Sequence, residues 1–156
     1  MNIFVISPYV GVNSMLFGMS RTRARVMLGK PTRERRSRCS LEVTDSWQPN
    51  NLQLTFSSPV GELLEISLYP GIGHVSLLDI DVFAEPRDRT YTTICRQDKS
   101  PLQTVGVTVL LSLGVSLTGF LHHDADGRSI SAFAQGRWSA QDPSLSPLKL
   151  PLEPLE

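Results

Sequence analysis

The amino-acid sequence predicts an α+β fold in which two related units, each a short helix packed on an antiparallel β-sheet, form one compact body. Three observations support this prediction: a capped helix near the N-terminus, stretches in which apolar and polar residues alternate, and a weaker copy of the same order of elements about 66 residues later. The chain of 156 residues is 40% hydrophobic and 19% charged, a composition typical of a globular domain with a buried core.

The first helix is predicted over residues 21–28. Ser20 is a favoured N-cap, because its hydroxyl accepts a hydrogen bond from a backbone N–H group of the first turn. Ala24 and Leu28 lie on one face together with the methionine between them, at the i, i+3 and i+4 spacing. Gly29 suits the left-handed conformation that ends many helices. A helix of about two turns is unstable alone in water, so we expect its apolar face to dock on a sheet.

Strands are predicted where apolar residues alternate with polar ones. Residues 2–6 suit a first strand or an ordered arm. Residues 36–43 alternate as in a half-buried strand whose solvent face carries arginine. Residues 52–56 and 64–68 alternate in the same way on either side of a loop that contains proline and glycine. This pattern predicts an antiparallel hairpin with one face in solvent.

The second half repeats this order of elements with little side-chain identity. Tyr91, Ile94 and Cys95 reproduce the helical spacing of the first half, and residues 113–117 and 130–134 predict a second hairpin.

The predicted boundaries give a first helix-plus-sheet unit at 1–73, a second and degenerate unit at 74–138, and a Pro-rich C-terminal tail at 139–156. Residues 71–81 are expected to join the two units. Prolines recur every few residues in the tail, which favours an extended and weakly held segment that frays or packs its leucines on the domain.

The two cysteines, Cys39 and Cys95, have no metal-ligand spacing, and both fall within apolar periodicity. We therefore expect two buried, reduced thiols rather than a disulfide. The N-terminal residues lack the pattern of a signal peptide, and no apolar run reaches the length of about 18 residues that spans a membrane. These features predict a cytoplasmic protein with no membrane partner.

Charge is distributed unevenly along a chain whose formal net charge is zero. Residues 21–38 contain seven arginines and Lys30 against a single acidic residue, Glu34, a net charge of +7. Arg21 and Arg25 are predicted to share one helix face. The cluster suits an acidic protein surface or the phosphates of a nucleic acid, and it also suits internal pairing with acidic residues elsewhere in the chain. The candidate partner-binding arginines are Arg33, Arg35, Arg36 and Arg38.

Catalytic and metal-binding motifs are weak. His74 has no carboxylate at a recognisable spacing, so a small hydrolase would need a pocket that joins His74 or His122 to a carboxylate. The segment 122–127 contains two histidines and two aspartates, but Asp-Gly between two strands is an ordinary hairpin signal, and the later ligands of a calcium loop are absent. We therefore expect no metal, no cofactor and no catalytic residues.

The segment 17–31 resembles the helix motif of BamE-like (SmpA-type) domains and of largely uncharacterised bacterial proteins that carry two such units in tandem. The matching residues are Gly18, Met19, Ser20, Ala24, Leu28, Gly29 and Pro31. Arg23 stands where relatives often carry an acidic capping residue, and the chain has no lipidatable N-terminal cysteine. The resemblance therefore implies a binding scaffold rather than a role in outer-membrane barrel assembly, and scaffolds of this shape recur among immunity and inhibitor proteins.

These observations together predict a non-catalytic protein-binding domain, of the immunity or inhibitor class, that recognises an acidic partner. Within the four candidate arginines, Arg36 and Arg38 supply charge complementarity, and Trp47, predicted near a strand edge, supplies a hydrophobic anchor. Nucleic-acid binding through residues 21–38 is the alternative, followed by the small hydrolase. No aromatic residue lies among the arginines of residues 21–38, which disfavours the stacking used in single-strand recognition.

Overall fold

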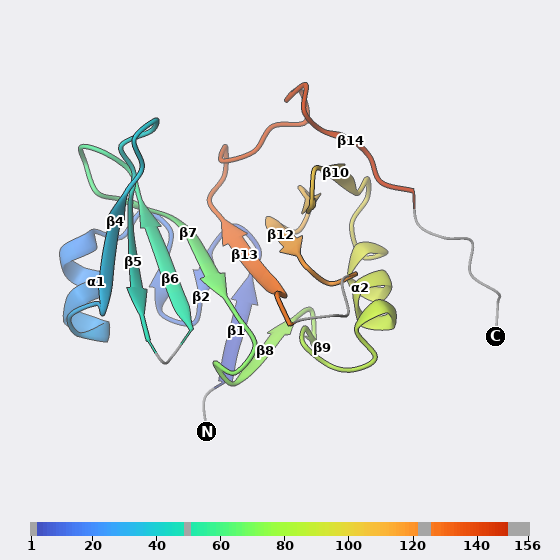
Figure 1. Ribbon diagram of the computed structural model, residues 1–156, viewed down its shortest axis with the longest axis horizontal. Coiled ribbons are helices and arrows are strands. Elements are labelled where there is room, and N and C mark those ends of the chain that lie inside the picture. Colours follow the sequence, from blue (N-terminus) through green and yellow to red (C-terminus); the bar gives the residue numbers. More distant parts are fainter. Residues whose placement is uncertain (1–2, 49–50, 122–125, 150–156) are drawn as a thin grey trace.

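A computed structural model describes residues 3–48, 51–121 and 126–149, and the described residues form two helices and fourteen strands (Figure 1). The helices are α1 (Arg21–Leu28) and α2 (Arg87–Cys95). The larger sheet has nine strands in the order β14 (Ser146–Pro147), β10 (Leu102–Thr104), β11 (Val107–Leu110), β12 (Val115–Thr118), β13 (Ser129–Phe133), β7 (Leu63–Leu68), β6 (Leu52–Phe56), β5 (Val43–Trp47) and β4 (Arg33–Arg36). The smaller sheet has five, in the order β3 (Met15–Leu16), β2 (Gly11–Val12), β1 (Ile3–Ser7), β8 (His74–Leu77) and β9 (Ile80–Asp81).

One hydrophobic core lies between the two layers. It combines side chains of the nine-stranded sheet, of the smaller sheet and of both helices, among them Leu54, Val12, Ala24 and Ile94. Figure 1 shows α1 and α2 at opposite ends of the larger sheet, with the smaller sheet between them. The face of the larger sheet that points away from this core is called the outer face below, and it carries mostly polar side chains.

The prediction of two helix-on-sheet units was wrong, because strands from the two halves pair directly. β7 and β13 are antiparallel neighbours, with Leu68 opposite Ile130, and a 2.7 Å hydrogen bond joins the hydroxyls of Ser67 and Ser131 across this junction. β1 and β8 pair in parallel within the smaller sheet. Both sheets therefore run through both halves of the chain, and the protein is mostly β.

The predicted first helix is confirmed at both ends. The Ser20 hydroxyl accepts a 3.1 Å hydrogen bond from the Arg23 backbone N–H, and Gly29 has a φ angle of 84° directly after the last helical residue. Ala24 is fully buried, whereas Met27 is 38% exposed. The apolar face that docks on the sheet is therefore narrower than the spacing predicted.

The second helix and the central hairpin also follow the predicted patterns. Tyr91, Ile94 and Cys95 are the buried residues of α2. β6 and β7 pair antiparallel, with an irregularity in the register between Thr55 and Phe56. This irregularity places Leu63 in the core, whereas the simple alternation assigned that face to residue 64.

Three local predictions were wrong: a strand at 36–43, a buried Cys39 and a linker at 71–81. Within 36–43, Arg36 ends β4 and Val43 begins β5, and the residues between them form the turn that joins these strands. In this turn Cys39 is exposed and Leu41 has a φ angle of 63°. The predicted linker at 71–81 contains β8 and β9.

The described part of the predicted tail lies on the domain. β14 pairs with β10, the Leu148 backbone N–H donates to the Pro101 carbonyl at 2.9 Å, and the Leu148 side chain packs against the core.

A single core predicts a single unfolding transition. Leu54→Ala removes a fully buried side chain of β6 and should lower the free energy of unfolding by about 2–5 kcal/mol while the transition stays cooperative. Val26→Ala, at a position 81% exposed, is the control and should change stability little. Chemical denaturation followed by circular dichroism and tryptophan fluorescence measures both variants. Two resolved transitions would show that the halves unfold independently and would contradict the shared core.

Candidate functional site

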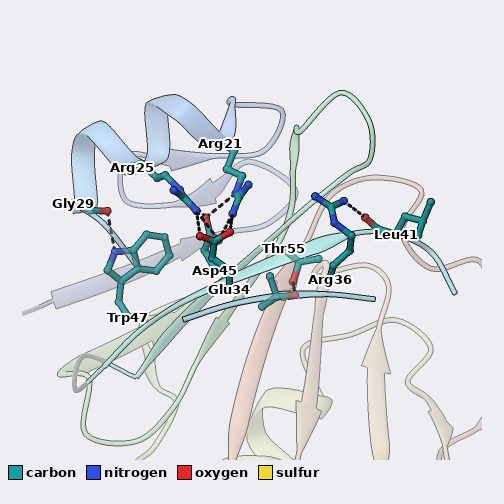
Figure 2. A network of polar contacts seen from close by, with 10 residues as sticks. Arg21, Arg25, Gly29, Glu34, Arg36, Leu41, Asp45, Trp47 and Thr55 are labelled. Carbon is teal, nitrogen blue, oxygen red and sulfur yellow. Dashed lines mark hydrogen bonds and ion pairs between the residues drawn. The ribbon is translucent and has the colours of Figure 1, made fainter. Parts of the chain in front are cut away.

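A buried aspartate joins α1 to the larger sheet. Asp45 on β5 is 0% exposed, and the Arg21 guanidinium donates hydrogen bonds of 3.0 and 2.8 Å to its two carboxylate oxygens. Arg25, one helical turn later, donates to the same oxygens at 3.3 Å. Figure 2 shows both arginines reaching from α1 to this carboxylate. Glu34 on β4 completes the network with contacts to Arg21 at 2.8 Å and Arg25 at 3.3 Å. Two of the seven arginines are therefore neutralised inside the protein.

The charge states of this network are fixed by its geometry. Burial alone raises the pKa of the Asp45 carboxyl, but the hydrogen bonds from Arg21 and Arg25 outweigh burial, and the pKa is lowered. The hydrogen bonds from the same two arginines lower the pKa of Glu34. Both carboxylates are therefore ionised at neutral pH, and they hold the start of α1 against β5.

Alternation along β4 separates its charges onto two faces. All four residues of β4 are exposed. Glu34 faces α1, where Arg21 and Arg25 bind it, so Arg33 and Arg35 lie on the outer face. Arg35 is opposite Thr44 in the register, and the Thr44 hydroxyl is hydrogen-bonded to that of Thr55 on the outer face. No residue of the described part of the chain forms an ion pair with Arg33 or Arg35.

The other two predicted arginines lie elsewhere. Arg36 is on the same face as Glu34, and its guanidinium donates to the Leu41 carbonyl at 2.9 Å, which stabilises the β4–β5 turn (Figure 2). Arg38 lies in that turn and is exposed. The structure thus brings Arg33 and Arg35 together on one face, and Arg36 and Arg38 belong to the turn beside them.

Arg137, from the second half of the chain, holds this turn in place. Its guanidinium contacts Glu42 at 2.5 and 3.0 Å and Glu65 on β7 at 3.0 Å. Burial lowers the pKa of Arg137, but the two carboxylates outweigh this effect and raise it. Sequence spacing gave no signal for this contact, because Arg137 and Glu42 are 95 residues apart.

Trp47 does not form the exposed anchor that was predicted. Its side chain is 5% exposed, and its indole N–H donates to the Gly29 carbonyl at 3.2 Å, so it fixes the end of α1 to β5 (Figure 2). Tyr69 directly follows β7. Its hydroxyl donates to Gln53 at 3.2 Å, and its pKa is raised by burial and by Glu65, against an opposing effect of Arg35. Tyr69 is therefore within electrostatic range of Arg35 on the outer face.

The two edges of the larger sheet differ. At one edge the sheet ends in β14, a two-residue strand that pairs with β10. β4 pairs only with β5 at the other edge. The backbone amides and carbonyls on the far side of β4 have no strand partner among the described residues, and this open, arginine-bearing strand is called the β4 edge below.

Groups suited to catalysis are dispersed. His74 on β8 lies 3.7 Å from Asp81 on β9, a carboxylate that spacing did not identify, and both side chains are 47% exposed on the surface. Burial raises the pKa of the Cys95 thiol to about 12, so it stays protonated, as expected for a structural thiol.

The segment 122–127, with its two histidines and two aspartates, lies partly outside the described residues. Residues 122–125 are outside the described ranges, so the predicted turn there has no structural test. Asp126 is described, and it accepts hydrogen bonds of 2.8 and 3.0 Å from Arg128, which is 5% exposed.

Comparison with protein-family models, curated proteins and solved structures finds no match to this chain. The resemblance to tandem BamE-like domains therefore stays a prediction. Neither described helix, at eight and nine residues, has the length and apolar character needed to cross a bilayer.

The Asp45 network predicts a stability difference between two carboxylates. Asp45→Asn leaves two arginines facing a neutral buried amide and should lower the free energy of unfolding by about 2–3 kcal/mol. This loss is smaller than that expected for breaking a fully enclosed ion pair, because the two arginine side chains are 27% and 31% exposed. Glu34→Gln, at a side chain 54% exposed, is the matched control and should have a much smaller effect. Equal losses in the two variants, measured by urea denaturation, would contradict the central role of Asp45.

The same network predicts acid sensitivity. Because the pKa of Asp45 is lowered on folding, its stabilisation is complete above the unfolded value of about 3.9 and disappears as pH falls through the lower folded value. The gap in unfolding free energy between the wild type and Asp45→Asn should therefore close between about pH 5 and pH 2. Urea denaturation at a series of pH values measures the gap. A gap that stays constant over this range would show that ionisation of Asp45 does not contribute.

Proposed function

We propose that this protein is a non-catalytic protein-binding domain, of the immunity or inhibitor class, that docks the β4 edge on an acidic surface of its partner. The observation that supports this proposal is the division of the arginine cluster. Arg21 and Arg25 are neutralised by Asp45 and Glu34, whereas Arg33 and Arg35 are exposed on the outer face and form no ion pair with any described residue. Charged groups left unpaired at one open edge are available for a partner.

Guanidinium chemistry favours carboxylates as the partner groups. A guanidinium presents a planar array of donors that binds a carboxylate through two parallel hydrogen bonds. Tyr69 lies on the outer face of the same sheet, where its hydroxyl is hydrogen-bonded to Gln53, and tyrosine and arginine are typical of the residues that dominate protein interfaces. Asp45 and Trp47 support the edge from behind without reaching the surface.

The arrangement favours an acidic protein over a nucleic acid. Phosphate binding draws affinity from many cations along one track, and α1 already commits two of its three arginines to Asp45. The outward pair on β4, Arg33 and Arg35, has exposed Arg36 and Arg38 beside it and forms a local group rather than a long track, which suits a protein patch. A nucleic acid is therefore treated as a separate outcome of the experiment.

The proposal is tested by affinity capture of a partner from native lysate, with and without nuclease, followed by mass spectrometry. The wild-type chain should retain a near-stoichiometric protein after nuclease treatment, and Arg33→Glu combined with Arg35→Glu should weaken the measured affinity at low salt by roughly tenfold or more, because each charge-assisted contact contributes about 1.5 kcal/mol or more.

Arg23→Glu combined with Arg89→Glu is the matched control. It makes the same change in net charge at two exposed helical arginines away from β4, and it should retain the partner. Equal loss in both double variants would show that net charge alone drives binding. Loss of every partner on nuclease treatment would move the site to nucleic acid.

A further inference from the structure

We infer that the partner binds in extended form, as an additional strand on the β4 edge, with acidic side chains at alternating positions facing Arg33 and Arg35. This inference rests on the proposed function and specifies the conformation and chemistry of the partner segment.

The first argument comes from the backbone. β4 is extended and exposed at every residue, and among the described strands it pairs with β5 alone. A strand in this position offers a row of backbone donors and acceptors to an incoming strand, and a segment that adds here gains main-chain hydrogen bonds whatever its side chains are. The same sheet already contains such a pairing at its other end, where the two-residue strand Ser146–Pro147 pairs with β10.

The second argument comes from side-chain spacing. Arg33 and Arg35 are two residues apart on one face, a separation of about 7 Å along the strand. Carboxylates at positions i and i+2 of an added strand repeat at the same interval on the same face. Glu34 lies between the two arginines in sequence but faces α1, where Arg21 and Arg25 bind it, so its charge does not oppose an acidic strand on the outer face.

The third argument excludes a second copy of the chain as the occupant. Two β4 strands brought edge to edge would place arginines opposite or diagonal to arginines, and like charges in such cross-strand positions repel. The same arginines that attract an acidic strand therefore oppose self-pairing.

The test is a titration of the ¹⁵N-labelled full chain, followed by NMR, with a capped nine-residue peptide that alternates glutamate and valine. We expect chemical-shift changes centred on the amides of residues 33–36 and a Kd below about 1 mM at low salt. Two matched peptides, one with lysine in place of glutamate and one with alternate backbone amides N-methylated, should each bind at least roughly tenfold more weakly.

Charge reversal gives a second readout. Arg33→Glu combined with Arg35→Glu should lose the glutamate peptide and gain the lysine peptide, with the shift changes still centred on β4, whereas Arg23→Glu combined with Arg89→Glu should keep the wild-type preference. Equal binding of the N-methylated peptide, shift changes away from β4, or no binding of the glutamate peptide up to about 1 mM would each overturn strand addition. If the lysate partner still requires Arg33 and Arg35 in that case, the proposed function stands and the partner presents a folded acidic surface.

Discussion

The buried carboxylate of Asp45 is the interaction on which the basic half of the protein depends. A charge with no exposure to solvent is stable only when it is paired and hydrogen-bonded, and two arginines of α1 provide both. Their contacts hold a helix that is too short to be stable alone, and they also attract Glu34 to the inner face of β4. Since β4 alternates, an inward Glu34 places the neighbouring arginines outward. The position of one aspartate is thereby coupled to the placement of Arg33 and Arg35 on the outer face.

The junction between β7 and β13 imposes the second constraint. It joins strands from the two halves of the chain, which the sequence suggested were two separate sheets, into one sheet of nine strands, and in the described residues β14 and β4 are the edge strands of that sheet. The Arg137 contacts to Glu42 and Glu65 act across the same junction and position the β4–β5 turn. The geometry of the basic edge consequently depends on residues from the far end of the chain.

Local signals in the sequence predicted local structure well. The N-cap at Ser20, the end of α1 at Gly29 and the buried face of α2 all follow from residues close together in the chain. The overall class was wrong because strand pairing is non-local: β8 occupies a segment that looked like a linker, and its partner β1 lies about seventy residues away. β4 has no apolar residue to produce an alternating pattern, so its extended form depends on pairing with β5. Of the predicted site, Arg33 and Arg35 lie together on one face. Trp47 was predicted to be an exposed anchor but is buried, because the pattern along its own strand does not show that α1 covers that face.

The difference between the two sheet edges bears on specificity. A sheet edge must be covered, shortened or charged if a protein is to avoid indiscriminate pairing. This fold ends one edge of the larger sheet in the two-residue, proline-containing β14 and charges the other with arginine. A short edge offers few backbone groups, whereas a charged edge leaves its backbone groups accessible to any segment that neutralises the arginines. Charge at β4 then selects partners in two ways, by attraction to alternating carboxylates and by repulsion of basic strands and of other copies of the chain. Specificity is the difference between the binding free energies of the favoured and the disfavoured partner. The two arginines lower the first and raise the second, so their position on an otherwise open strand makes β4 a selective edge.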